Sequence, residues 1–336
     1  PEEDMKLAIL GSASSLQKDQ SSVIKYEEVA SSFNDFKALR FKNAVPPKAI
    51  NPAQFRKMDD FSKLVAVTTA RALENSQINL KKIDTSKVGI VFTTPSGPVD
   101  VVEGIEKQIT TEGYSHVSAS RFPFTVMNAA AGMLSIMFKI KGPLSVISTN
   151  SGAIDGIQYA KEMMKNDGLE YVLLVSAHQW TDMSLMWWEQ LGYNSKEYVG
   201  ADYCSVQVLS RQQTGNNPIM LGSKQLKYSN KTLDEISSIF EHSFKELMSN
   251  LHLSPNDIKG IVWNERKKIN SLDYDFLHQI SEQYQFSNFG KDQFDFSSNG
   301  AGEELDFITN TNLSPGYYMA LSYSKFGGIS FAIIEK

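Results

Sequence analysis

Short runs of apolar residues alternate along this chain with stretches in which apolar residues recur at helical spacing. The runs typical of buried strands cover residues 6–10, 144–148, 171–176, 205–209, 258–263, 317–323 and 329–334. Helical spacing covers residues 61–76, 154–165, 235–248 and 272–285, and Thr232 with Glu235 forms a capping box before the third of these helices. Alternation of this kind predicts an α/β fold.

Three segments refine this pattern. Residues 171–176 are apolar almost without interruption, which predicts a central strand of the sheet. Residues 129–138 are small and apolar on every side, which predicts a buried helix. The polar stretch 211–218 contains glycine and proline, so it is the best boundary between an N-terminal half over residues 5–212 and a C-terminal half over residues 218–336, joined as one compact unit.

The composition excludes several classes of function. The 336 residues are 41% hydrophobic, enough for a large core, and their formal net charge of −5 argues against a nucleic-acid partner. No apolar run reaches the roughly 18 residues of a membrane span, and no signal segment opens the chain, so we expect a cytoplasmic protein without membrane contact. Glycine-rich phosphate loops and zinc-like spacings are missing from the sequence, so we expect no cofactor and no metal.

The most informative chemistry lies where the strand at 144–148 meets the helix that follows it. The turn between them reads Asn150-Ser151-Gly152. A strand–turn–helix elbow holds one side chain at a helix N-terminus, where main-chain N–H groups and the helix dipole favour an anion or an ionised thiol. The side chain at the tip is the Asn150 carboxamide, which cannot act as a nucleophile in acyl transfer.

Several motifs, in order along the chain, resemble those of the β-ketoacyl-acyl carrier protein synthases, the condensing enzymes of the thiolase fold. They are the stretches 56–63, 87–94, 121–128 and 140–143, the elbow itself, and the glycine-rich turn at 322–328. The resemblance implies a thiolase-like five-layer αβαβα architecture built from two related halves. It also implies dimer formation.

In that family a cysteine at the elbow accepts the acyl chain, and two histidines and a lysine assist. The match places Asn150 at the cysteine and Asn264 at the first histidine. The second histidine and the lysine would precede Asn299, and residues 292–302 contain neither residue type. The resemblance therefore implies a chain that is catalytically inactive on its own, with a pocket near the elbow formed by Asn150, Ser151, Ser324, Lys325 and Phe326.

A condensing-enzyme fold without its cysteine is similar to the chain-length factors of type II polyketide and polyene synthases. Such a subunit pairs with an active ketosynthase as a heterodimer, forms one wall of the acyl tunnel, and meets the acyl carrier protein only indirectly. By this match, the interface and tunnel residues are Phe122, Pro123, Phe124, Thr125, Met127 and Asn128.

Two other interpretations stay open. The chain could decarboxylate malonyl-carrier protein with the Asn150 amide as a donor to the enolate oxygen, or it could be a non-enzymatic homodimeric scaffold. Of the five histidines, His178 is the one placed to line a cavity, although a structural role is the simpler interpretation. Cys204 opens a core strand, so we expect a buried and unreactive thiol.

Overall fold

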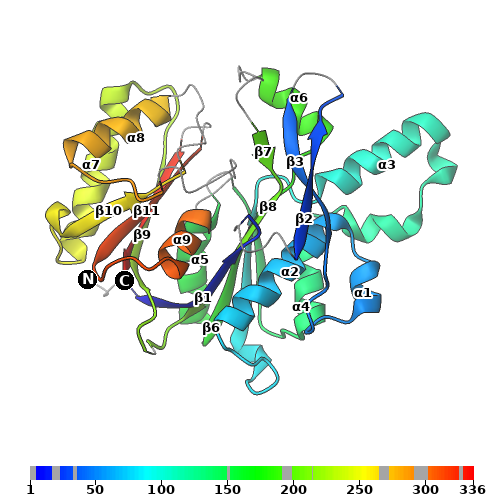
Figure 1. The fold of residues 1–336 in the computed structure, drawn as a ribbon, viewed down its shortest axis with the longest axis horizontal. Helices are drawn as coiled ribbons and strands as arrows, with labels where there is room; N and C mark the ends of the chain where they lie inside the picture. The colour runs from blue at the N-terminus through cyan, green and yellow to red at the C-terminus, as the bar shows by residue number, and fades with distance from the viewer. Residues whose placement is uncertain are drawn as a thin grey trace.

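A computed structural model describes most of the chain. The described residues are 5–16, 23–32, 36–149, 152–190, 199–213, 215–264, 272–290, 302–324 and 328–336. Helices and sheet alternate in layers across the molecule, as Figure 1 shows.

The described strands form one nine-stranded sheet and one three-stranded sheet. The order in the large sheet is β10-β11-β12-β9-β1-β8-β6-β4-β5. The bounds are β1 Leu7–Ser14, β4 Val88–Thr94, β5 Leu144–Ser148, β6 Tyr171–His178, β8 Tyr203–Ser210, β9 Ile219–Lys227, β10 Ile258–Val262, β11 Tyr317–Ser324 and β12 Gly328–Glu335. The predicted central strand is confirmed, because β6 lies between β8 and β4.

The large sheet consists of two parts joined by a short antiparallel ladder. This ladder pairs Leu7 with Met220 and Ala8 with Ile219. Strands from residues 7–210 lie on one side of it, and strands from residues 219–335 lie on the other. The exact division at residues 212–218 stays a prediction, as does the relation between the two halves.

Two helices lie between the two parts of the sheet. Helix α5 (Ala153–Asn166) contacts β4 and β6 on one side and β9 and β12 on the other. Helix α9 (Gly302–Asn310) contacts β1 and β8 on one side and β10 and β11 on the other. Their apolar side chains share one core with both parts, which places α5 and α9 in the middle layer in Figure 1.

The outer helices cover the two remaining faces. Helices α2 (Asp60–Asn75) and α4 (Ala129–Phe138) pack against the N-terminal strands in a core that contains Phe61 and Phe92. Helices α7 (Leu233–Asn250) and α8 (Leu272–Gln283) pack against the C-terminal strands in a second core that contains Phe240. The capping box of Thr232 and Glu235 is present at the start of α7, as predicted.

The prediction that residues 129–138 form a buried helix is wrong in one respect. The helix forms, but its buried residues are Ala130, Ala131, Leu134 and Phe138, and Ile136 is 65% exposed. An apolar composition on every side indicates that the whole surface is covered, so one face of α4 is left uncovered in the single chain.

Several further elements surround the start of helix α3 (Val99–Glu112). They are the small sheet of β2 (Ile24–Ala30), β3 (Lys37–Ala44) and β7 (Val199–Ala201), helices α1 (Pro52–Arg56) and α6 (Asp182–Gln190), and the 3-10 helix η4 (Ala119–Phe124). Figure 1 shows α3 extending away from the layered body.

Candidate functional site

The strand and the helix that flank the predicted elbow, β5 and α5, are present, and they are tied to the C-terminal part of the sheet. Gly152 precedes α5 with φ of 68°, a backbone conformation that suits glycine. The Thr149 hydroxyl donates to the Asp155 carboxylate, which also accepts from Ser330 Oγ on β12 at 3.0 Å. Burial raises the pKa of Asp155, while these hydroxyl donors act in the opposite direction. The elbow is therefore anchored from both parts of the sheet.

Most residues of the predicted degenerate site and of its pocket lie outside the described part of the chain. These are Asn150, Ser151, Lys325, Phe326 and Asn299 with the residues just before it. Ser324 is the last residue of β11, and its side chain also lies outside the described part of the structure. Their assignment to a degenerate site and its pocket stays a prediction.

Asn264, at the predicted histidine position, binds two buried glutamates at the start of α9. It follows β10 and is 1% exposed. Its side-chain Nδ2 donates to Glu303 Oε2 at 3.2 Å, and its main-chain N–H donates to Glu304 Oε1 at 3.2 Å. Glu303 and Glu304 are 5% and 0% exposed. The residue at this position is therefore held by two carboxylates, one through its carboxamide and one through its main chain.

The start of α9 is packed against β8 without spare room. A Cβ added at Gly302 would overlap Ser205 Oγ and Tyr203 Oη, so a larger residue does not fit there. Gln207 Nε2 donates to the Gly302 carbonyl at 3.2 Å and fixes the same turn. This close approach brings Glu303 and Glu304 into the interior, although acids in a first helical turn normally face solvent.

The six predicted interface residues lie together on one surface segment. Phe122 is 55% exposed and Met127 is 36% exposed, while Phe124 and Thr125 are half-buried. Pro123 is exposed within η4, and Asn128 is exposed at the start of α4. The segment presents aromatic and sulfur-containing side chains to the outside, but their role in binding a partner stays a prediction.

His178 and Cys204 are both buried, at the end of β6 and the start of β8 in the N-terminal part of the large sheet. Burial lowers the pKa of His178 to about 4, and within the described chain neither ring nitrogen has a hydrogen-bond partner. The imidazole packs edge-on against Trp180. Burial raises the pKa of Cys204 to about 12, so this thiol is protonated and unreactive at neutral pH, as predicted.

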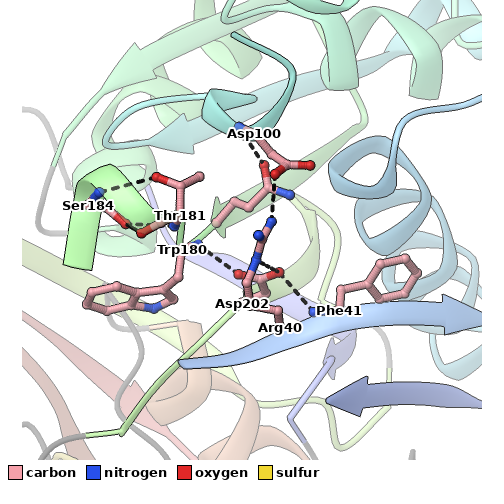
Figure 2. Close-up of polar contacts among 8 residues, drawn as sticks. Arg40, Phe41, Asp100, Trp180, Thr181, Ser184 and Asp202 are labelled. Atoms are coloured by element: carbon pink, nitrogen blue, oxygen red, sulfur yellow. Dashed lines mark hydrogen bonds and ion pairs between the residues drawn. The ribbon is translucent and has the colours of Figure 1, made fainter. Parts of the chain in front are cut away.

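A polar cluster that the sequence did not reveal joins four segments beside the start of α3. Asp202 is 1% exposed and accepts from the Trp180 N–H at 2.7 Å and the Phe41 N–H at 2.9 Å. Arg40 Nε lies 4.0 Å from Asp202, and Arg40 Nη2 donates to Asp100 Oδ1 at 2.9 Å. Figure 2 shows Arg40 between the two carboxylates.

The charge of Asp202 is poorly stabilised despite these contacts. Burial raises its pKa to about 6, and Arg40 and the two main-chain donors only partly oppose the shift. An acidic residue between Ala201 and Tyr203, at the entry to a buried strand, is the sequence signal that could have identified this cluster.

The described part of the chain contains no group of three or more His, Cys, Asp or Glu side chains arranged to hold a metal ion. Within the same residues, the helices are too short or too polar to cross a membrane.

Residues 19–186, half of the chain, match the sequence profile of the family described as Beta-ketoacyl synthase, N-terminal domain. Among curated proteins, the chain is 23% identical over 145 residues to 3-oxoacyl-[acyl-carrier-protein] synthase 2 of Coxiella burnetii, a match that covers 43% of this chain and 35% of that protein. It is 28% identical over 135 residues to the enzyme of the same name from Vibrio harveyi, covering 40% and 32%. These matches therefore span about a third of the relatives' length.

Solved structures match over nearly the whole chain. The ishigamide ketosynthase/chain length factor has a TM-score of 0.73 at 12% identity, with 98% of this chain and 99% of that chain covered. A ketosynthase structure described as AntDE:AntF, a type II PKS acyl-carrier protein in complex with its ketosynthase, has a TM-score of 0.72 at 15% identity, with coverage of 98% and 99%. At these identities the likeness concerns the fold, and the predicted thiolase-like α/β architecture is confirmed.

Proposed function

The chain belongs to the β-ketoacyl synthase family, and from that starting point we propose that it is a non-catalytic subunit that pairs with an active ketosynthase and shapes the acyl tunnel of that partner. Such a subunit would serve the synthesis of polyketides, polyenes or similar acyl chains. The observation that carries the proposal is the β5 face, by which we mean the open edge of β5 together with Phe122, Val126, Ile136 and Tyr159.

The two edges of the nine-stranded sheet differ, and the difference favours a protein partner at β5. Beside β10, the Ile261 N–H donates to the Ser287 carbonyl and the Phe289 N–H donates to the Ile261 carbonyl, both at 2.9 Å, so this edge is covered. At the other end of the sheet, β5 pairs with β4 and, in the described chain, has no second neighbour. An unpaired edge strand is a template for a strand of another chain.

The exposed side chains of the β5 face have the character of an interface core. Tyr159 accepts from Ser145 Oγ on β5 at 3.3 Å, and Ile136 lies on α4, which contacts β5. Phe122 and Val126 lie on the segment that leads into α4. Phe122 and Val126 are 55% and 51% exposed. Ile136 on α4 and Tyr159 on α5 are 65% and 44% exposed. Single exposed apolar residues are common, but apolar residues gathered beside an open strand edge indicate an association surface. Phe124 lies on the same segment, and we assign its side chain to the partner's tunnel.

The buried acids at α9 count against the malonyl decarboxylase interpretation. By the family resemblance, Asn264 stands where a histidine would meet the malonyl group, and Glu303 lies within hydrogen-bond distance of its amide. Two unit charges about 4 Å apart repel by roughly 4 kcal/mol at an effective dielectric constant near 20. An ionised Glu303 would therefore repel a malonyl carboxylate where a decarboxylase has to hold it.

We infer that an acyl carrier protein is a partner of the complex rather than of this chain alone. The AntDE:AntF structure contains a type II PKS acyl-carrier protein in complex with its ketosynthase. In the proposed pair, the carrier protein delivers its acyl group to the subunit that keeps the cysteine.

Co-expression with a cysteine-bearing ketosynthase from the same genome tests the proposal. We expect the two chains to elute together in equal amounts, and this chain to be poorly soluble without the partner because the β5 face is then exposed. A stable homodimer that ignores the ketosynthase would contradict the proposal and favour a scaffold. Carbon dioxide release from malonyl-carrier protein by the isolated chain would favour the decarboxylase.

A further inference from the structure

We propose that Arg40 is a positioning residue that fixes α3 and, through α3, the η4 segment that carries Phe124. The inference rests on the proposed function, since it gives Arg40 an influence on the length of the product. It is carried by three features of the structure: how α3 begins, what holds Arg40, and how α3 contacts η4.

Helix α3 begins without a cap of its own. Its N-cap residue is Pro98, and no side chain of the cap accepts a hydrogen bond from the first turn. The first turn of a helix has main-chain N–H groups that need acceptors. Here Gln179 Oε1 accepts from the Asp100 N–H at 3.4 Å, and the Asp100 carboxylate accepts from Arg40 Nη2 at 2.9 Å. Contacts from outside the helix therefore add to the local main-chain bonds of Val99 and Val101 at its start.

Arg40 in turn forms an ion pair with a buried carboxylate, at 4.0 Å between Nε and Asp202, although Nε has no hydrogen-bond partner within the described residues. Asp202 is buried at the start of β8 and is fixed by the main-chain N–H groups of Phe41 and Trp180. The planar guanidinium of Arg40 faces Asp202 with Nε and Asp100 with Nη2, as Figure 2 shows. A lysine has a single ammonium group and cannot make both contacts in this geometry.

The position of α3 is transmitted to η4 through two close approaches at glycines. A Cβ on Gly97, just before α3, would lie 3.2 Å from Met127 Cα. A Cβ on Gly104, within α3, would lie 2.8 Å from Arg121 Nη2. The Met127 contact involves main chain, so a shift of α3 toward it presses on the backbone that joins η4 to α4, whereas the end of the Arg121 side chain can adjust.

Asp100 and Phe124 also face the same cleft. This cleft has a volume of about 300 Å³ and lies among α1, the starts of α2 and α3, and η4. Arg40 thus sets one wall, through Asp100, and Phe124 stands on another. The proposed length-determining side chain is held in place from β3 and β8, across α3.

The test compares three variants of this chain in the two-subunit complex. Arg40→Gln removes the ion pairs of Arg40 with both Asp100 and Asp202. Asp100→Asn removes only the charge of Asp100 and leaves the contact between Arg40 and Asp202 in place, so it tests the same idea without leaving Asp202 buried beside a neutral side chain. Glu106→Gln is the matched control, because Glu106 is an exposed acid on the same helix. Hydrogen exchange is measured over residues 97–128, and product length is measured by mass spectrometry.

We expect Arg40→Gln and Asp100→Asn to speed exchange over residues 99–104 roughly tenfold and to broaden the product distribution, with the yield of complex unchanged. Glu106→Gln should match the unmodified complex in both measurements. Unchanged exchange, or unchanged product length despite faster exchange, would overturn the inference. If the unmodified complex makes no product, the proposed function fails instead. The positioning role of Arg40 is then decided by hydrogen exchange over residues 119–128 alone: faster exchange in Arg40→Gln supports it, and unchanged exchange overturns it.

Discussion

Replacing Ile136 with aspartate tests the β5 face with little risk to the fold. Ile136 is 65% exposed, so the single chain loses little packing. Fully burying an isoleucine contributes roughly 1.5–3 kcal/mol, and the exposed share of this side chain therefore offers about 1–2 kcal/mol to a partner. An aspartate buried without a counter-charge adds a penalty of roughly 3–5 kcal/mol. Because about 1.4 kcal/mol is a tenfold change in Kd, we expect roughly 5- to 30-fold weaker binding from the lost apolar contact alone, and about 1000-fold or more if the carboxylate is fully buried.

Binding to the ketosynthase is measured by sedimentation or biosensor titration, with the melting temperature of each variant recorded alongside. Phe289→Asp is the control, since Phe289 is 38% exposed beside β10 at the opposite edge of the sheet. We expect its Kd to stay within about twofold of the unmodified protein, because the residue lies far from the proposed interface. An Ile136→Asp chain that binds as tightly as the unmodified chain would refute the assignment of the β5 face.

Three further predictions follow from the interior and from η4. Gly302→Ala should lower the free energy of unfolding by about 3 kcal/mol in urea titrations, because the new methyl group overlaps Ser205 and Tyr203, and the added change Ser205→Gly should recover part of the loss. Since burial raises the pKa of Asp202 from 3.8 to about 6, the native state binds that proton more tightly than the unfolded chain. The free energy of unfolding should therefore decrease as the pH is raised from 4 to 6, by up to about 3 kcal/mol. Asp202→Asn should make this decrease smaller, and an unaltered pH dependence in that variant would contradict the prediction. Phe124→Ala in the complex should lengthen the products, and unchanged product length would remove Phe124 from that role.

Much of the fold was predictable because its signals are local. Residues 171–176 are apolar on both faces of a strand, and β6 is internal as a result. Thr232 and Glu235 satisfy each other's main-chain donors, so the start of α7 follows from four residues. The hairpin of β2 and β3 gave no such signal. Its strands are largely exposed and joined by ion pairs such as Lys37 with Glu28, so no apolar alternation marks them.

The candidate site was predictable only in outline. The elbow follows from its strand, turn and helix. The burial of Glu303 and Glu304 does not, because two acids in a first helical turn are ordinary at the surface, and only the contact of Gly302 with β8 brings them inside. The link from Asp202 to Arg40 joins residues 162 positions apart in the chain, a distance over which sequence patterns carry no pairing information. The apolar composition of α4 predicted that the whole helix is buried within its own chain, and the exposed Ile136 shows that it is not.

The most direct test of a non-catalytic partner subunit is condensation by the two-chain complex with one active-site position changed at a time. Replacing the ketosynthase's catalytic cysteine with alanine should abolish the product, and Asn150→Ala in this chain should leave the rate of condensation within about twofold, since the acyl group never joins this subunit. Condensed product from the complex that lacks the partner's cysteine, or loss of condensation in the Asn150→Ala complex, would contradict the account.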